Sequence, residues 1–317
     1  ETRVDYSLLF NEKVEVLRVA FSNFDKENDT VWLSQKQMAD LFDVTTDNIG
    51  LHIKKIISSG ELDESTTEEY SVVQLEGQRK VKRKIKFDNL DMQEAINKCN
   101  GFLKSDKLNY IVTPNPEIVM EAKKDEEFKE ILNQADLSIP DGIGVVIASK
   151  ILKMPLKQRV AGFDLICNLF ENNENEKKVY LLGSKPGVCE LAKEKIEEKY
   201  NVKVVGMHDG YFKEDDEKKI IEDINNSGAN ILLVGMGMKK QEKLIYKYKD
   251  SLKVKIAIGC GGSIDVFSGT VKRAPKFFQK CGLEWLYRII KQPTRIKRMM
   301  VLPKFLLIIL FKVKKNK

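Results

Sequence analysis

Short apolar runs alternate with polar turns and helical periodicities along residues 110–146. The first run, residues 110–112, breaks on Thr113-Pro114-Asn115-Pro116, and apolar side chains then recur at a mostly 3.6-residue spacing from residue 117 to about residue 135. A second run, residues 137–139, breaks on Pro140-Asp141-Gly142 before another helical stretch. This succession of strand, turn and helix predicts parallel strands with crossover helices, the arrangement of an α/β Rossmann-like fold.

Three later apolar runs are each predicted to be a strand that leads directly into a glycine. The runs and their glycines are residues 179–182 with Gly183, residues 231–234 with Gly235 and Gly237, and residues 256–258 with Gly259 and Gly261. A turn of this kind offers backbone N–H groups and a helix N-terminus to a phosphate. None of the three has the spacing of a GxGxxG or Walker motif, so each alone is a weak indication of nucleotide binding.

Three polar side chains, Thr113, Asn115 and Asp141, follow the first two predicted strands. Ligands of a parallel sheet bind beyond the carboxyl ends of its strands, so one sheet edge can present this hydroxyl, amide and carboxylate to one cleft. The same residues also fit a simpler interpretation, in which Thr113 and Asn115 close a turn and Asp141 caps the helix that begins at Gly142. The residue types alone leave both interpretations open.

Composition describes a soluble, Lys-rich globular chain of 317 residues, 42% hydrophobic and 32% charged. Its five cysteines are an odd number without a CxxC pair, which argues against a disulfide framework or a zinc site and fits a reducing cytoplasm. Cys260 has no activating neighbour in sequence, so we expect a packed residue rather than a nucleophile. His208 fits a site residue as well as a hydrogen-bonded surface histidine.

The net charge of +7 is concentrated at the C-terminal end. Residues 272–317 contain fourteen Lys or Arg and one acidic residue, Glu284, whereas the other 271 residues carry a net charge of −6. This asymmetry predicts an anionic partner for the tail, either a membrane surface or a phosphate-bearing ligand. Residues 301–311 are almost wholly apolar but too few to span a bilayer, which takes about 20 residues. We expect an interfacial anchor, with a helix buried against the main domain as the alternative.

Residues 1–85 differ from the rest and predict a small separate domain. A strand at residues 30–33 precedes two short helices joined by a tight turn, which is typical of a helix-turn-helix motif. The stretch resembles the N-terminal part of RhuM-type virulence proteins. Residues 1–100 hold fourteen basic and nineteen acidic residues, a balance that offers few phosphate contacts. A nucleic-acid-binding domain and a small helical interaction domain both stay open.

From about residue 85 to the end, the chain resembles the WecG/TagA/CpsF family of bacterial glycosyltransferases. The resemblance lies in short stretches that follow the family's order, each weak alone and highly specific together. They are residues 88–95, 113–117, 139–145, 159–162, 182–187, 208–212, 235–242, 259–275, 282–288 and 293–295. Where the family usually reads Pro-Lys-Gln-Glu, this chain has Lys239-Lys240-Gln241-Glu242. That change predicts a looser start of the helix with Gln241 still in place.

The resemblance implies inverting transfer of an N-acetylmannosamine-type sugar from UDP to N-acetylglucosamine on undecaprenyl pyrophosphate. It places the reaction at the cytoplasmic face of the membrane, as an early step in wall teichoic acid or similar envelope glycan synthesis. Whether the donor is UDP-N-acetylmannosamine, its uronic acid or another UDP-sugar stays open. The competing hypothesis is a nucleic-acid-binding regulator that acts through residues 1–85 and carries an inactive second half.

The resemblance also assigns roles to residues. It implies that Asp141 is the catalytic base, which suits a carboxylate beside an acceptor hydroxyl, and that Thr113 and Asn115 position the donor sugar and its phosphates. Further substrate-binding positions are Gly142, Gly183, Gly235, Gly237, Gln241 and Gly261. The matched region has no Asp-x-Asp metal motif, so we expect no cofactor and no metal. The departing diphosphate then needs cationic side chains, which the resemblance assigns to Arg288, Arg295 and Arg298.

Three parts are therefore expected. Residues 1–85 form the helix-turn-helix-like domain and residues 86–275 the Rossmann-like glycosyltransferase domain, for which nucleic acid is not an expected partner. Residues 276–317 form a basic appendage, whose last part, residues 301–317, is the expected anchor on an anionic membrane surface.

Overall fold

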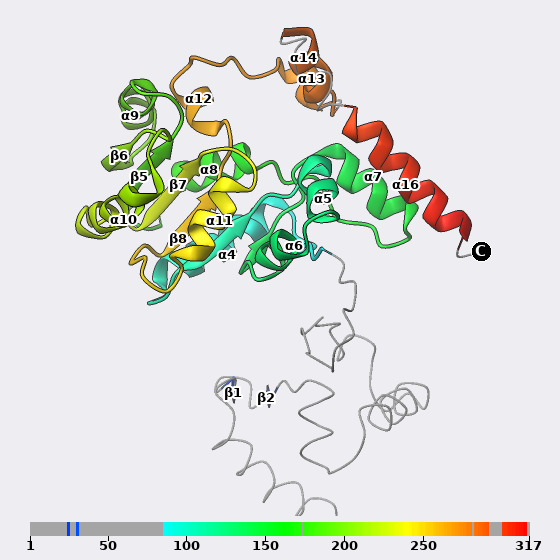
Figure 1. Cartoon of the computed structure of the whole chain (residues 1–317), viewed down its shortest axis with the longest axis horizontal. Helices are drawn as coiled ribbons and strands as arrows, with labels where there is room; N and C mark the ends of the chain where they lie inside the picture. The colour runs from blue at the N-terminus through cyan, green and yellow to red at the C-terminus, as the bar shows by residue number, and fades with distance from the viewer. Residues whose placement is uncertain are drawn as a thin grey trace, which may run out of the picture. The chain divides into compact units, whose positions relative to one another are not determined.

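The computed structural model describes residues 24–25, 30–31, 85–172, 174–280, 282–291 and 300–315 (Figure 1). The chain divides into two compact units, residues 1–82 and residues 83–317. In the first unit, strand β1 (Phe24–Asp25) pairs antiparallel with strand β2 (Thr30–Val31). The predicted helix-turn-helix and its likeness to RhuM-type proteins fall outside the described residues and stay predictions.

The second unit is built on a six-stranded parallel sheet with the strand order β4-β3-β8-β7-β5-β6. The strands are β3 (Asn109–Val112), β4 (Leu137–Ser138), β5 (Lys178–Gly183), β6 (Lys203–His208), β7 (Ile231–Gly235) and β8 (Ile256–Gly259). The α/β Rossmann-like fold predicted from the sequence is confirmed. The connection from β5 runs outward to β6, whereas that from β7 runs the opposite way to β8. The crevice between β5 and β7 is therefore a topological switch point.

Helices cover both faces of the sheet (Figure 1). The helices between residues 85 and 267 are α4 (Met92–Lys104), α5 (Pro116–Ala122), α6 (Glu126–Asn133), α7 (Ile143–Ile151), α8 (Gly162–Glu171), α9 (Val188–Lys199), the 3₁₀ turn η2 (Glu214–Asp216), α10 (Glu217–Asn226), α11 (Lys240–Lys247) and α12 (Ser263–Phe267). Strand side chains alternate between two cores: Val179 and Leu181 pack with α4, α8, α9 and α12, whereas Tyr180 and Leu182 pack with α5, α6, α10 and α11. Burial on both faces explains why these strands are continuous apolar runs.

The helix predicted for residues 117–135 is two helices, so that prediction is wrong in its continuity. Helix α5 ends at Ala122 and α6 begins at Glu126. The break lies in a polar stretch, Lys123-Lys124-Asp125, where the Asp125 side chain accepts a hydrogen bond of 3.0 Å from the backbone N–H of Phe128. Aspartate is favoured as such an N-cap. The apolar periodicity runs across the break because both helices pack on the same face of the sheet.

The C-terminal appendage consists of α13 (Lys276–Lys280), α14 (Glu284–Lys291) and α16 (Val301–Lys315). Helix α16 packs against α5 and α7, and Phe305, 5% exposed, joins Met120 and Ala148 in a small apolar cluster. Its other face stays in solvent. One side of α16 is thus packed on the domain. This agrees, for that side, with the alternative prediction of a helix buried against the main domain. Among the described residues, no helix is both long and apolar enough to span a bilayer.

Candidate active site

Two neighbouring strands, β3 and β4, deliver the first candidate residues to one edge of the sheet. Asn115 follows β3 and caps α5, because its Oδ1 accepts a hydrogen bond of 3.0 Å from the backbone N–H of Ile118. Asp141 follows β4, and its backbone N–H donates to the carbonyl of Pro114, 3.3 Å away. The N-cap of α7 is Gly142, with a φ of +125°, so Asp141 stands one residue before the capping position.

A cleft with about 750 Å³ of empty space, open to solvent, lies where these two strands end. Three of the predicted site residues line it: Asn115, Asp141 and Gly142. The rest of the wall comes from α5, α7, Arg159 and the appendage, namely Pro116, Glu117, Ile143, Gly144, Arg159, Gly282, Glu284, Trp285, Val301 and Leu302. The appendage therefore completes this cleft.

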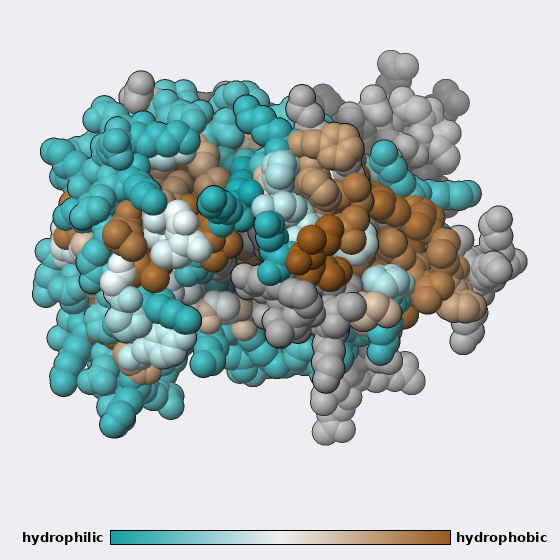
Figure 2. Space-filling model, turned by 90° about the horizontal axis from the view of Figure 1, so that it is seen from above, coloured by the Kyte–Doolittle hydropathy of each residue, from teal (hydrophilic) through white to brown (hydrophobic). Residues whose placement is uncertain are grey.

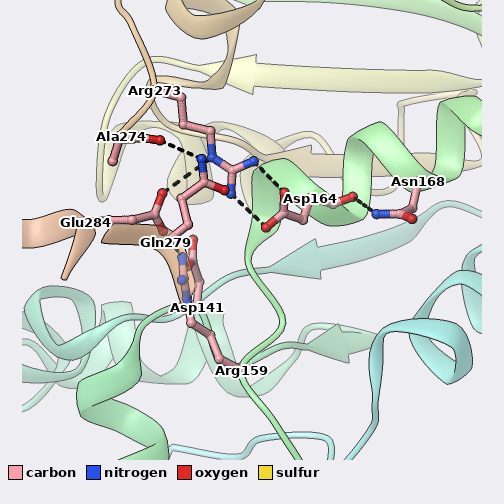
Figure 3. A network of polar contacts seen from close by, with 8 residues as sticks. All are labelled: Asp141, Arg159, Asp164, Asn168, Arg273, Ala274, Gln279 and Glu284. Carbon is pink, nitrogen blue, oxygen red and sulfur yellow. Dashed lines mark hydrogen bonds and ion pairs between the residues drawn. The ribbon is translucent and has the colours of Figure 1, made fainter. Parts of the chain in front are cut away.

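A network of charged side chains runs from Asp141 into the appendage (Figure 3). Nη2 of Arg159 lies 3.7 Å from Oδ1 of Asp141 and also pairs with Oε2 of Glu284 in α14. The other Glu284 oxygen lies 3.4 Å from Nε of Arg273. Arg273 in turn makes a bidentate pair with Asp164 at the start of α8, at 2.5 and 2.7 Å. Glu284 thus ties α14 to both Arg159 and Arg273 at the cleft.

Glu284 is only 12% exposed, so its two ion pairs are poorly screened by solvent. Burial acts to lower the pKa of Arg273, but the hydrogen bond and charge of Asp164, together with Glu284, hold that pKa above its ordinary value. Arg273 is therefore a fixed cation in this network. Asp141 itself is 31% exposed, which leaves its carboxylate accessible from the cleft.

Arg159, Arg273 and Glu284 were not singled out as site residues by the sequence. Each lies inside a stretch that carries the family resemblance, so the signal was present in the motifs. Glu284 is also the one acidic residue in the basic tail.

Thr113 lies beside this cleft rather than among its lining residues. Its methyl group packs against the first residue of α8: a Cβ added to Gly162 would come within 2.9 Å of Thr113 Cγ2. Thr113 therefore fixes how closely α8 approaches the end of β3. Its predicted role toward the donor sugar stays a prediction.

A second group of predicted residues gathers at the ends of β5, β7 and β8. A Cβ on Gly183, whose φ is +140°, would lie 2.5 Å from the carbonyl group of Gly235, so the two backbones touch. The backbone N–H of Ser184 donates to that Gly235 carbonyl at 3.1 Å. Gly237 and Gly261 also have positive φ, at +85° and +53°. Only glycine accommodates such conformations freely, so this edge is shaped by bare backbone.

Gln241 is buried beneath that glycine group, 3% exposed. Its Oε1 accepts from the backbone N–H of Gly261 at 3.0 Å, and its Nε2 donates to Glu242 at 2.7 Å. Gln241 is in place at the start of α11, and the looser helix start expected from the missing proline stays a prediction. Lys239 has a φ of +76°, and its backbone N–H donates to Glu242 at 2.6 Å. Proline has a fixed negative φ and no backbone N–H to donate. The N-cap of α11 in this chain therefore differs from one that has the family's proline at this position.

The remaining predictions concern the basic arginines, metal, Cys260 and His208. Arg288 is part of α14, but its side chain, like all of Arg295 and Arg298, is outside the described structure. Within the described ranges no three His, Cys, Asp or Glu side chains gather as metal ligands, and metal independence stays a prediction.

Cys260 is buried, and burial raises the pKa of its thiol, so the prediction of a packed residue is confirmed. His208 is hydrogen-bonded through Nδ1 to the Asp209 carbonyl at 2.8 Å.

Residues 82–317 match the model of the glycosyl transferase WecG/TagA/CpsF family. A match over most of the chain, together with the parallel sheet and the cleft at its carboxyl edge, identifies the class: this protein belongs to that family of glycosyl transferases.

Individual relatives share one activity name, N-acetylglucosaminyldiphosphoundecaprenol N-acetyl-beta-D-mannosaminyltransferase. The chain is 38% identical to the protein of that name from Bacillus spizizenii over 211 residues, which cover 66% of this chain and 81% of the relative. The Bacillus subtilis (strain 168) protein is 39% identical over 209 residues, or 65% and 80% of the two chains. The Staphylococcus aureus (strain MRSA252) protein is 36% identical over 225 residues, or 70% and 88%.

Proposed function

We propose that this protein transfers N-acetylmannosamine from UDP-N-acetylmannosamine to N-acetylglucosamine carried on undecaprenyl pyrophosphate. The names of its relatives supply the acceptor and the transferred sugar. The observation that carries the proposal is the position of Asp141, an accessible carboxylate in a cleft at the carboxyl edge of the sheet. The product fits a lipid-linked disaccharide for wall teichoic acid or a related envelope glycan.

Asp141 acts as the general base in this proposal. The relatives' names specify a beta linkage, and an alpha-linked UDP-sugar reaches it by inversion in one displacement. The acceptor hydroxyl oxygen attacks the anomeric carbon, its proton passes to Asp141, and the electron pair of the breaking bond leaves with UDP. Arg159, 3.7 Å from Asp141, holds positive charge beside the carboxylate.

Two further groups handle the donor and the leaving diphosphate. The backbone around Gly183, Gly235 and Gly261 forms a surface on which a nucleotide diphosphate can approach closely, next to N–H groups. Arg288, Arg295 and Arg298 supply the positive charge that the departing UDP requires. No cofactor takes part in this scheme.

The proposed place of work is the inner face of the cell membrane, with the protein bound peripherally. Support comes from the basic tail and from apolar side chains on the free face of α16, including Leu307, Leu310 and Phe311. The acceptor is a membrane lipid, so an enzyme held at the bilayer meets it by two-dimensional diffusion.

The decisive experiment offers the full chain a set of UDP-sugars with a short-chain, water-soluble analogue of the lipid-linked GlcNAc. We expect UDP release and a product heavier by one N-acetylhexosamine with UDP-N-acetylmannosamine alone. UDP-N-acetylglucosamine and the UDP-linked uronic acid serve as competing donors. Faster turnover of the uronic acid would replace the proposed donor, and no turnover of any donor would reject the proposed function.

A further inference from the structure

Residues 142–163 form a second stretch that combines basic and apolar side chains. They contain Lys150, Lys153, Lys157 and Arg159 and no acidic residue, although the first 271 residues as a whole carry a net charge of −6. This stretch comprises α7, the loop that follows it and the first residues of α8. It shares its composition with the C-terminal tail, which is more than a hundred residues away in sequence.

Helices α7 and α16 lie side by side and run in the same direction (Figure 1). Near their amino ends, Gly144 faces Leu302 so closely that an added Cβ would collide with it. One turn further on, Ala148 packs in the same apolar cluster as Phe305. The carboxyl end of α7 and the loop after it therefore lie along the later turns of α16.

Apolar side chains from both segments stay exposed at this end of the domain. Those of α7 and its loop are Ile147, Leu152 and Met154, and those of α16 are Leu307, Leu310 and Phe311. Met154 is 63% exposed and Phe311 67%. Figure 2 shows hydrophobic side chains gathered over the part of the surface that carries α7 and α16, whereas the end with α9 and α10 is largely hydrophilic.

The loop after α7 has a defined conformation. Helix α7 ends at Ile151, and Lys153 adopts a left-handed φ of +60°, which is usually left to glycine or asparagine at a helix end. The backbone N–H of Met154 donates to the carbonyl of Ser149 at 2.9 Å, and that of Leu156 to Ser149 Oγ at 3.1 Å. The loop thus holds Met154 and Lys153 outward despite the backbone strain at Lys153.

We propose that Ile147, Leu152, Lys153 and Met154 form, together with the exposed face of α16, a single surface that contacts an anionic lipid bilayer. Charge favours this partner, because Lys150, Lys153 and Lys304 border the exposed apolar side chains and the two segments contain no acid. The inference deepens the proposed function and rests on it, since it adds a second membrane-contact element to the tail.

The two helices also connect this surface with the cleft. Gly144 and Leu302, near their amino ends, line the cleft, whereas the exposed apolar side chains lie toward their carboxyl ends. The nine residues of α7 measure about 13 Å. The cleft and the proposed bilayer surface lie at opposite ends of this helix pair, so only about the length of α7 separates them. An acceptor can therefore keep its lipid in the bilayer while its sugar enters the cleft at Asp141.

The test is co-sedimentation of the full chain with phosphatidylglycerol vesicles, with phosphatidylcholine vesicles as the uncharged reference. Met154→Glu should weaken binding on the order of tenfold, since an exposed apolar side chain that would enter the bilayer is replaced by a charge that the anionic lipid repels. Lys153→Asn should weaken it about fivefold, because asparagine tolerates the left-handed conformation and removes one charge. Leu191→Glu, on α9 and 44% exposed, is the matched control and should bind like the parent chain.

A tail variant, Leu310→Glu, separates the two proposals. Loss of binding in Leu310→Glu with unchanged binding in Met154→Glu and Lys153→Asn would overturn this inference and leave the tail anchor standing. Unchanged binding in all variants would reject both. Turnover of the short-chain acceptor by Met154→Glu should equal that of the parent chain, which shows a folded site. If Met154→Glu instead only converts an oligomer to a monomer in analytical ultracentrifugation, the surface is a contact between copies and the inference fails.

Discussion

The carboxyl edge of the sheet has two regions, one lined by charged and polar side chains and the other by glycine backbone. Beyond β3 and β4 the wall is made of charged and polar side chains, with Asp141, Arg159 and Glu284 in one network. Beyond β5, β7 and β8 it is made of backbone, where Gly183 and Gly235 touch and a buried Gln241 holds Gly261 from below. Side chains move protons and balance charge, whereas bare backbone gives close access to a ligand.

In the proposed function, this division separates the proton transfer from the binding of the nucleotide. The region beyond β3 and β4 is also the one that the appendage covers, through Glu284 and Trp285. The proposed base, Asp141, and the basic appendage thus lie at the same end of the sheet. If the division is right, substitutions in the first region affect turnover, and substitutions in the second affect affinity and stability.

The largest expected effect comes from Asp141→Asn. Removal of a general base lowers turnover by about 10²- to 10⁴-fold, while affinity for UDP, measured by calorimetry, should stay within about twofold because the nucleotide region is untouched. Asp91→Asn is the control: it caps α4, a role that asparagine performs equally well. Near-normal turnover in Asp141→Asn would place the base elsewhere.

Next in size are the arginines of the appendage. Arg288→Ala, Arg295→Ala and Arg298→Ala should each reduce turnover of a soluble acceptor, by up to about 10²- to 10³-fold for a group that stabilises transition-state charge. Lys291→Ala, in the same helix as Arg288, controls for a general loss of positive charge. Equal activity of all three arginine variants on that acceptor would limit their role to attraction by the membrane.

Gly183→Ala tests the backbone region and should act mainly on stability and nucleotide affinity. The new Cβ would lie 2.5 Å from the Gly235 carbonyl at a φ of +140°, which costs about 1–3 kcal/mol in the free energy of unfolding. Gly101→Ala in α4 has nothing within 4 Å and should gain about 0.5–1 kcal/mol. Urea denaturation measures both. A Gly183→Ala protein as stable as the parent would contradict the close backbone contact.

The sequence predicted the parallel sheet, the glycine turns and the neighbouring positions of Asn115 and Asp141 because these follow from local periodicity and from the shared edge of parallel strands. It did not predict the break between α5 and α6, since the apolar spacing continues through Asp125. It also missed the pairing of Arg159 with Glu284, 125 residues apart in sequence. Such a contact depends on where the appendage docks, which no local pattern specifies.

The smallest expected effect is a pH dependence that comes from Glu242 in the backbone region. The carboxyl group is 2% exposed, and burial raises its pKa above the ordinary 4.5, against the hydrogen bonds from Gln241 and the backbone of Lys239. The folded protein therefore binds this proton more tightly than the unfolded chain. Its contribution to stability is fully present below pH 4.5 and is lost as the pH rises through the folded pKa.

A single proton limits the slope to about 1.4 kcal/mol per pH unit. Urea denaturation of the parent chain and of Glu242→Gln between pH 4 and pH 8, about the range in which one raised carboxyl titrates, isolates this group, because all other titrations cancel in the difference. The stability of the parent relative to the variant should fall as the pH rises. A difference that is constant with pH, or that grows toward pH 8, would mean that Glu242 is ionised in the fold with its charge fully compensated by Gln241 and the start of α11.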